Sequence, residues 1–485
     1  MGKPAQPRTS QDIPYLITQP DRVPARRYYD PEFYALECER LWPRVWQMAC
    51  RLEEIPKPGD FVVYDVLDQS IIVTRVDEKT VKAYHNACRH RGVQLAQDRG
   101  HCPTGFTCPF HGWQWSLDGV CKMVYTPQVF SRENLNKSDL RLRECRLETW
   151  GGCAFINLDD NAPPLRDSIE PFATMFDVWH AETLRVEWWL SARLPVNWKL
   201  AMEAFMEGYH VMATHPQLVV SGLDGSALSY RETPPSFSPA SRYLTLPTKD
   251  PEQPVPAHAL KETIIRSLKV LGEGMAGMAH AKDIRVAESL RDLELPEDMF
   301  EANVAFRRKL HQAVMQSHKN AGVDIPDLDE VEEKRFATGV NFCFPHYFLL
   351  PTLGSASSYR IRPLGPEECL FELWSLTRYP EGEQRPPIKT PTPMTFDDPR
   401  WPAIPAQDFS NLPKQQRGLH TKGFEFMRLS NKVEGLVSNY QRLIDGYLME
   451  LGYDKLTPAA HKVSGAIDMP IADLGFEPPA AASAD

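Results

Sequence analysis

Two short segments place two cysteines and two histidines where a single metal centre can use all four side chains. The first segment reads NACRHRG and contains Cys88 and His90; the second reads CPFHGWQW and contains Cys108 and His111. Each segment offers one thiolate and one imidazole, whereas zinc fingers usually take two cysteines from one segment and two histidines from the other. The mixed arrangement favours a [2Fe–2S] cluster with two cysteines on one iron and two histidines on the other. A structural zinc ion remains the alternative.

Both segments lie in a part of the chain that has the pattern of short β-strands. Runs such as FVVYDV and QSIIVTRV, separated by turn-forming residues, continue to about residue 158. We therefore expect a small all-β domain over residues 41–158. A helix is expected before it, over 28–47, with Asp30 as the N-cap and Pro31 in the first turn.

The rest of the chain has a mixed α+β pattern. Helical spacing of apolar residues occurs at 197–214 and 424–451, strand-like segments occur at 339–350, 357–363 and 368–378, and the proline-rich stretch 381–406 is expected to be a loop. An elaboration beside the active site is expected at 222–340, polar and proline-rich over 222–257 and helical over 258–320. The tail from Pro478 is expected to be disordered.

A second candidate metal site lies in the segment NWKLAMEAFMEGYHVMATHP, which contains His210 and His215. Mononuclear iron oxygenases bind Fe(II) through two imidazoles and one carboxylate, which leaves positions open for O₂ and substrate. Residues five apart are rotated by about 140° on a regular helix, so an undistorted helix cannot direct both histidines at one ion. A π-bulge or a helix end near Thr214 would bring them together, and Pro216 favours such a break.

Taken together, these segments resemble the alpha subunit of Rieske non-haem iron oxygenases, which hydroxylate aromatic rings. NACRHRG and CPFHGWQW resemble the Rieske domain of that family, and NWKLAMEAFMEGYHVMATHP resembles its catalytic-iron segment. The resemblance implies an α+β fold class: a small all-β Rieske domain, and a larger helix-grip domain in which helices and an antiparallel sheet surround a mononuclear iron. The implied ranges are a helical segment packed on the catalytic domain at 1–40, the Rieske domain at 41–158, the catalytic domain at 159–470 and a disordered tail at 471–485.

The resemblance also implies roles for individual residues. Glu207, three residues before His210, occupies the position of an acidic residue that links the iron site to the cluster of a neighbouring subunit, through the neighbour's copy of His111. Most of the family has Asp there, and some members with Glu attack quaternary-ammonium substrates. The implied cluster ligands are Cys88, His90, Cys108 and His111, and the implied Fe(II) ligands include His210 and His215.

The third Fe(II) ligand is expected far along the chain. The segment PAQDF, followed by QRG, resembles the late acidic motif of the family, which assigns Asp408. Asp397 and Asp398 are competitors for that role. Tyr209 and Asn197 are candidates for the pocket wall or for contacts with the ligands, although ordinary packing explains such residues equally well.

The electron donor is expected to be another protein. The sequence contains no glycine-rich dinucleotide-binding motif, so electrons from NAD(P)H would arrive through a separate reductase, with or without a ferredoxin. The resemblance implies a head-to-tail homotrimer, to which some members of the family add a small beta subunit.

Composition narrows the cellular setting. The net charge of −10 argues against a nucleic-acid surface, and no run of about 18 apolar residues suggests a membrane span. The N-terminal residues MGKPAQPRTSQ lack the apolar core of a secretory signal, and the ten cysteines favour a reducing compartment. The expected location is the cytoplasm.

The leading functional hypothesis is the cis-dihydroxylation of a small aromatic substrate. The alternative within enzymes is a Rieske monooxygenase that hydroxylates or demethylates an alicyclic, steroid-like or quaternary-ammonium substrate. Two non-enzymatic alternatives are an electron-transfer protein with a degenerate second domain and a zinc-stabilised binding module.

Overall fold

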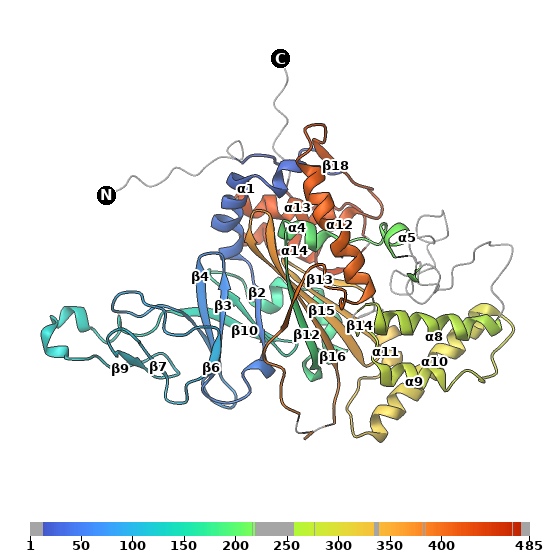
Figure 1. Cartoon of the computed structure of the whole chain (residues 1–485), viewed down its shortest axis with the longest axis horizontal. Helices are drawn as coiled ribbons and strands as arrows, with labels where there is room; N and C mark the ends of the chain where they lie inside the picture. Colours follow the sequence, from blue (N-terminus) through green and yellow to red (C-terminus); the bar gives the residue numbers. More distant parts are fainter. Residues whose placement is uncertain are drawn as a thin grey trace, which may run out of the picture.

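The computed structural model describes residues 13–215, 217–218, 257–275, 277–333, 339–380, 382–383, 385–467 and 469–476. The expected polar stretch 222–257, apart from its last residue, and the tail from Pro478 lie outside the described residues. Figure 1 shows three regions: a β-rich lobe, a central sheet covered by helices, and a helical lobe on the opposite side. No helix among the described residues is both long and apolar enough to cross a membrane.

The helix expected at 28–47 begins where the sequence places it and then changes its winding. Asp30 accepts hydrogen bonds from the backbone N–H groups of Glu32 and Phe33, so α1 (Pro31–Leu36) starts at Pro31. A π-helical turn over Glu37–Leu41 and a 3₁₀ turn over Trp42–Arg44 follow.

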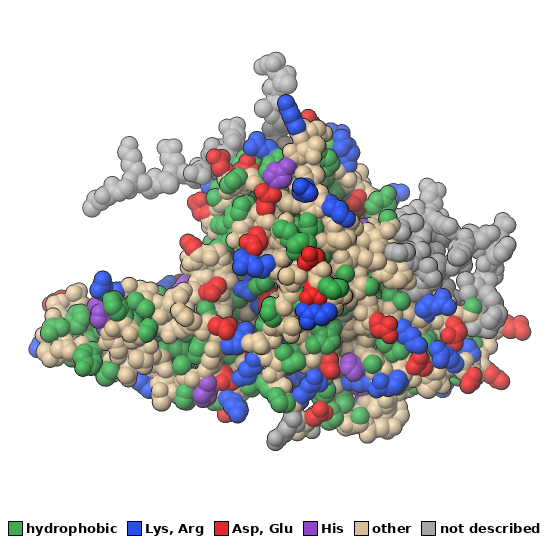
Figure 2. All heavy atoms as spheres, viewed as in Figure 1, with side chains coloured by type: hydrophobic (Ala, Val, Ile, Leu, Met, Phe, Trp, Pro, Cys, Tyr) green, Lys and Arg blue, Asp and Glu red, His purple; other side chains and the backbone are tan. Residues whose placement is uncertain are grey.

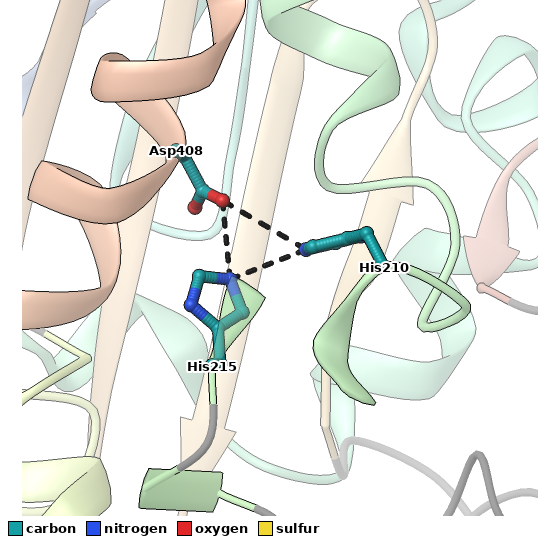
Figure 3. A group of neighbouring side chains, drawn as sticks. All are labelled: His210, His215 and Asp408. Carbon is teal, nitrogen blue, oxygen red and sulfur yellow. Dashed lines mark hydrogen bonds and ion pairs between the residues drawn. The ribbon is translucent and has the colours of Figure 1, made fainter. Parts of the chain in front are cut away.

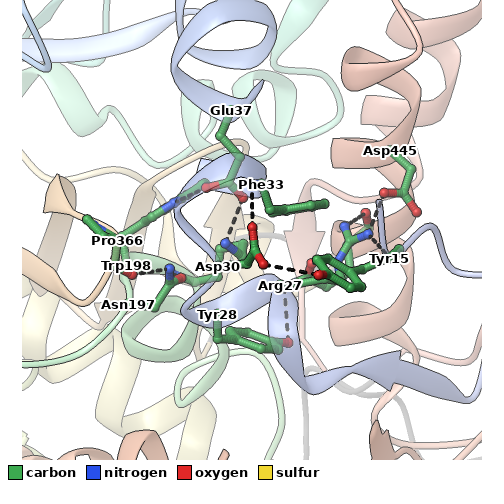
Figure 4. Close-up of polar contacts among 12 residues, drawn as sticks. Tyr15, Arg27, Tyr28, Asp30, Phe33, Glu37, Asn197, Trp198, Pro366 and Asp445 are labelled. Atoms are coloured by element: carbon green, nitrogen blue, oxygen red, sulfur yellow. Dashed lines mark hydrogen bonds and ion pairs between the residues drawn. The ribbon is translucent and has the colours of Figure 1, made fainter. Parts of the chain in front are cut away.

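The N-terminal segment packs on the catalytic domain. Its strand β1 (Arg22–Pro24) pairs with β18 (Phe426–Arg428), and Arg27 forms a buried ion pair with Asp445. Figure 4 shows the pair of Arg27 with Asp445 of α13 (Gly435–Leu448) and a hydrogen bond from Trp198 of α4 (Trp198–Glu203) to Glu37.

The β-rich lobe contains two antiparallel sheets. The larger has the order β2 (Gln47–Arg51), β11 (Cys153–Asn157), β10 (Glu144–Trp150), β5 (Val81–His85), β4 (Gln69–Arg75), β3 (Asp60–Val66) and β6 (Arg99–His101). The smaller consists of β7 (Phe106–Thr107), β8 (Gln114–Trp115) and β9 (Cys121–Met123). This is the all-β domain expected from the alternation of apolar and polar residues.

A second large sheet forms the centre of the molecule. Its order is β17 (Thr392–Thr395), β12 (Arg185–Leu194), β16 (Glu368–Thr377), β15 (Ser355–Gly365), β14 (Tyr347–Thr352), β13 (Asn341–Cys343) and β19 (Gly465–Ala466). All neighbouring strands are antiparallel except β12 and β17. The three expected strand regions are confirmed, with a turn between β13 and β14 dividing the first.

Helices cover one face of this sheet. Helix α4 packs directly on β15 and β16, and α12 (Ala403–Leu419) contacts α4. Two sequence expectations differ from the structure here: the loop expected at 381–406 contains β17 and the start of α12, and the helix expected at 424–451 begins only at Gly435, after β18. Beyond α13 and α14 (Tyr453–His461), the packed chain continues into the segment expected to be disordered, since Leu474 is buried.

The helical lobe corresponds to the elaboration expected at 258–320. It contains α8 (Ala257–Glu273), α9 (Ala281–Glu288), α10 (Met299–Asn320) and α11 (Leu328–Glu333). The buried pair Asp283 and His318, 2.7 Å apart, joins α9 to α10, and Asp283 also accepts a hydrogen bond from the N–H of Gly354 in the β14–β15 turn. The expected fold class, an all-β domain joined to a larger α+β domain, is confirmed.

Candidate metal centres

Two loops of the β-rich lobe have the same backbone hydrogen bonds around their cysteines. Cys88 N–H donates to the carbonyl of Val93, and Cys108 N–H donates to that of Trp113, each at 2.8 Å. Each cysteine carbonyl in turn accepts a bond from a glycine, Gly92 or Gly112, four residues later. Both glycines have positive φ, 78° and 71°, a conformation that residues with a Cβ rarely adopt. Both loops therefore close in the same way and present one thiol and one imidazole each.

The four candidate side chains are suited to a [2Fe–2S] cluster. The rings of His90 and His111 lie 4.6 Å apart, and His90 stacks on Trp113 at 4.8 Å. The Nδ1 atom of His90 is buried and has no hydrogen-bond partner within the described part of the chain. Burial, His111 and Arg91 lower the pKa of His90, so the ring favours its neutral, metal-binding form. A buried imidazole nitrogen without a hydrogen-bond partner is available to bind a metal.

The second candidate site forms because the helix expected over 197–214 breaks. Helix α4 ends at Glu203, and His210 is the N-cap of the short α5 (Val211–Thr214), with His215 at its C-cap. The helix end expected near Thr214 is therefore present, together with an earlier break that the spacing did not predict. One helical turn between the histidines brings their Nε2 atoms to 3.2 Å from each other.

The carboxylate of Asp408, from α12, completes this group. Its Oδ1 atom lies 3.1 Å from His215 Nε2 and 3.8 Å from His210 Nε2 (Figure 3). Among the described residues, these three form a group whose possible ligand atoms all lie within 4.8 Å of one another. The side chains of His215 and Asp408 are buried, whereas that of His210 is 25% exposed, so the site is open on the His210 side. Two imidazoles and one carboxylate on one face of a common point suit Fe(II) with open positions.

Neighbouring side chains fix the orientation of both imidazoles. The Oε1 atom of Glu207 lies 2.7 Å from His210 Nδ1, and because a carboxylate only accepts, Nδ1 donates and Nε2 is the nitrogen that can bind a metal. His215 Nδ1 likewise donates to the side-chain oxygen of Gln407 at 2.7 Å, and Gln217 donates to the same oxygen. The sequence reasoning missed Gln407 and Gln217; the position of Gln407 directly before Asp408 was the signal that could have found it.

The other candidates do not belong to this metal-binding group of described residues. Asn197 caps α4 by accepting a bond from Lys199 N–H, and its amide donates to the carbonyl of Pro366. Tyr209 is 57% exposed at the surface next to Glu207. Asp398 binds Arg400 in an exposed turn, and neither Asp397 nor Asp398 belongs to the metal-binding group found among the described residues.

The two candidate centres of one chain lie far apart. In Figure 1 the strands β7 and β9 are at one end of the molecule, and α5 is on the other side of the central sheet. A cluster in the β-rich lobe is therefore not placed to transfer electrons directly to the iron site of its own chain.

Comparison with known proteins identifies both regions. Residues 45–133 match the Rieske [2Fe-2S] domain, and residues 181–450, more than half of the chain, match the ring hydroxylating alpha subunit (catalytic domain). The match to the Rieske domain supports a [2Fe–2S] cluster over zinc.

Two curated relatives illustrate the range of the family. The carnitine monooxygenase oxygenase subunit of Escherichia coli (strain K12) is 29% identical over 196 residues, covering 40% of this chain and 52% of the relative. The anthranilate 1,2-dioxygenase large subunit of Acinetobacter baylyi is 34% identical over 203 residues, covering 40% of this chain and 42% of the relative. The matched part thus spans about half the length of these relatives.

Solved structures share the fold over most of the chain. A quaternary ammonium Rieske monooxygenase in complex with L-carnitine has a TM-score of 0.56 at 16% identity, covering 89% of this chain and 97% of the other. A naphthalene 1,2-dioxygenase bound to phenanthrene has a TM-score of 0.60 at 18% identity, covering 93% and 98%. With two family matches in this order and the same fold, the chain belongs to the alpha subunits of the Rieske ring-hydroxylating oxygenases.

Proposed function

We propose that this chain is the terminal oxygenase component of a multicomponent Rieske oxygenase and that it hydroxylates an aromatic substrate by cis-dihydroxylation. The observation that carries the proposal is the convergence of His210, His215 and Asp408 in a chain that also has the four cluster side chains. When bound, the mononuclear iron would activate O₂, and the cluster would supply electrons that a separate reductase takes from NAD(P)H. A protein that only transfers electrons would not need the group formed by His210, His215 and Asp408.

The proposed roles follow from the contacts of each residue. Cys88, His90, Cys108 and His111 hold the cluster; His210, His215 and Asp408 hold the iron. Glu207 keeps His210 in the tautomer in which Nε2 can bind a metal, and it lies on the His210 side of the site, where the two side chains are 12% and 25% exposed. From this position it can also contact a second protein chain, as a bridge between centres requires.

The proposed partner at that edge is the β-rich lobe of a second copy, in a head-to-tail homotrimer. The lobe carries exposed apolar side chains. Phe110, whose ring lies 4.1 Å from that of His111, is 59% exposed, and Tyr125 and Val129 are 67% and 72% exposed. Figure 2 shows hydrophobic side chains on the surface of this lobe. Heterologous contacts of this kind close into a ring. A native mass of one chain for protein with both metal centres would contradict the trimer.

A second candidate reaction is the monooxygenation of a quaternary-ammonium substrate. It is favoured by Glu207, since the family has Asp at this position in most members, and by the similarity to a carnitine monooxygenase subunit. The Glu207 side chain reaches His210 with a normal hydrogen bond, so the longer side chain is compatible with the bridging role in either reaction.

Single-turnover oxidation under ¹⁸O₂ distinguishes the two reactions. Chemically reduced protein with both centres loaded is mixed with anthranilate, other aromatic acids and rings, carnitine or glycine betaine, and the products are analysed by mass spectrometry. Two labelled atoms in one aromatic product are expected; one labelled atom in a demethylated or hydroxylated ammonium product would support the second reaction. The His215→Ala variant, with the cluster intact, should yield neither. Product formation undiminished in that variant would contradict the proposed site.

A further inference from the structure

Tyr359 has a buried hydroxyl group for which the described part of the chain provides no hydrogen-bond partner. It lies on β15, on the face of the central sheet that is covered by helices, and its side chain is fully buried. No hydrogen bond to its hydroxyl is found within the described residues. Buried tyrosine hydroxyls usually have a partner, and an exception at a binding site indicates a group that a ligand completes.

The other hydroxyl groups on this face of β15 have partners. Ser357 donates to the carbonyl of Met275 at 2.7 Å, and Ser355 donates to that of Met278 at 3.4 Å. Both partners belong to the segment after α8, which covers that end of the strand. Among the described residues, the Tyr359 hydroxyl is therefore the hydroxyl on this face of β15 that has no hydrogen-bond partner.

A continuous set of aromatic contacts connects Tyr359 to the metal-binding group. The Tyr359 and Phe371 rings are 5.5 Å apart, the Phe371 and Phe409 rings are 5.1 Å apart, and Phe409 directly follows Asp408. Burial raises the pKa of Tyr359, and the charge of Asp408 raises it further. These contacts place Tyr359 on the face of the central sheet that packs against α12, the helix of Asp408.

The same aromatic residues do not form a cage for a quaternary ammonium group. Such a cage needs open ring faces around the cation. Here the ring of Phe205 occupies the centre: it lies 4.9 Å from Tyr359, 5.6 Å from Phe371 and 5.9 Å from Phe348. The rings are thus packed against one another. The Tyr359 hydroxyl is the group of this aromatic set that can form a hydrogen bond with a ligand.

We propose that Tyr359 is a specificity-determining residue whose hydroxyl donates a hydrogen bond to an oxygen or nitrogen substituent of an aromatic substrate bound at the metal site. This inference rests on the proposed function and deepens it: the substrate class becomes an apolar ring with one hydrogen-bond acceptor. The apolar part contacts the aromatic wall, and the substituent orients the ring relative to the iron.

The test compares matched ligands in wild type, Tyr359→Phe and Tyr440→Phe. Tyr440 is the control because its hydroxyl is also buried and without a partner among the described residues, while its ring packs against Trp198, Phe342 and Phe344. Each pair of probes consists of a ring hydrocarbon and the same ring with a hydroxyl or amino group, in one-ring and two-ring sizes. Binding is measured by titration calorimetry without O₂, so that activity is not needed, and kcat/KM is measured under turnover.

Wild type and Y440F should bind the substituted ring more tightly than the hydrocarbon, and Y359F should lose this preference by about tenfold to a hundredfold. The hydrocarbon should bind Y359F at least as well as wild type. An equal preference in Y359F and wild type, or no binding of either ring by wild type, overturns the inference. Failure of the proposed function would look different: ligand preference would change as expected, but labelled O₂ would enter no product.

Discussion

At the scale of single residues, the geometry of the iron site depends on side chains that do not bind metal. The oxygen of Gln407 accepts bonds from His215 and from Gln217, and Gln217 accepts one in return from the Gln407 amide. This reciprocal pair fixes which way the Gln407 amide points. Hydrogen bonds of this kind typically strengthen metal binding by about 10- to 100-fold.

We therefore expect Gln407→Leu to lower the affinity for iron by about 10- to 100-fold while the cluster stays intact. Iron per chain, measured after dialysis against a series of chelator concentrations, and acid-labile sulfide report the two centres separately. Gln416→Leu is the matched control, because Gln416 is a buried glutamine of the same helix that bonds Asn197, Tyr28 and Glu367 instead. This control should lower the melting temperature without changing iron affinity; the reverse pattern would contradict the role of Gln407.

At the scale of elements, α4 is held in place by buried charges. Lys199 forms an ion pair with Glu37 at 2.6 Å, with both side chains fully buried, and Glu203 accepts a bond from the Tyr28 hydroxyl at 2.9 Å. Figure 4 shows the polar contacts between the N-terminal segment, the start of α4 and α13. Because His210 follows only a short turn after α4, these contacts set the position from which the metal-binding segment starts.

Glu203 gives this element a predicted pH dependence. Burial raises its pKa from 4.5 to about 7, despite bonds from Gln441 and Tyr28. The folded protein holds the Glu203 proton more tightly than the unfolded chain does, and this stabilises the fold. The contribution to the free energy of unfolding, about 3 kcal/mol, is complete below about pH 4.5 and is lost as the pH rises through about 7.

Glu203→Gln cannot ionise, so its stability relative to wild type should rise between about pH 5.5 and pH 8. Denaturant unfolding at both pH values measures the difference. Glu450→Gln, at a position whose side chain is 56% exposed, controls for the removal of a charge. A stability difference between E203Q and wild type that stays constant with pH would show that Glu203 does not titrate in this range.

The elements also show what the sequence can and cannot predict. The strands β15 and β16 follow from their apolar pattern, and Asp408 was assigned from its motif. Its helix was missed because the surrounding prolines indicate a loop, yet Pro402 is the N-cap of α12 and Pro405 lies in the first turn, where no N–H bond is required. Tyr359 contacts elements far away in the chain, so no local pattern identifies it, and for Gln407 the one local signal is its position directly before Asp408.

At the scale of the whole molecule, the two domains are joined by buried polar groups of the central sheet. Arg360 on β15 forms two 2.8 Å bonds to Glu372 on β16, and its remaining nitrogen donates to the backbone carbonyls of Met48 and Ala49 on β2. His346 accepts a bond from Met48 N–H at 3.0 Å and lies near the same junction. Burial keeps the pKa of His346 well below its ordinary value, so the ring is neutral and can accept this bond.

Removal of Arg360 should therefore weaken the attachment of the Rieske domain. We expect Arg360→Met to cost up to about 3–5 kcal/mol, because it leaves the buried Glu372 with only the longer ion pair to Arg362, at 3.4 Å. On heating, the visible absorption of the cluster should be lost before the far-UV circular dichroism of the whole chain, whereas in wild type both should change together. The double variant Arg360→Met with Glu372→Gln should recover part of the stability, since the buried carboxylate is then removed as well.

The pair Arg193 and Glu368 provides the control for this comparison. It also joins neighbouring strands of the central sheet, with the same 2.8 Å distance, but its side chains are 67% and 43% exposed. Arg193→Met should cost less than about 1 kcal/mol because water screens an exposed pair. Equal losses of stability in R360M and R193M would mean that Arg360 does not join the domains. A larger loss in R360M alone, with early loss of the cluster absorption, would mean that the Arg360 guanidinium holds the Rieske domain on the catalytic sheet. The position of the Rieske domain on the catalytic domain would then depend on a residue outside both candidate metal centres.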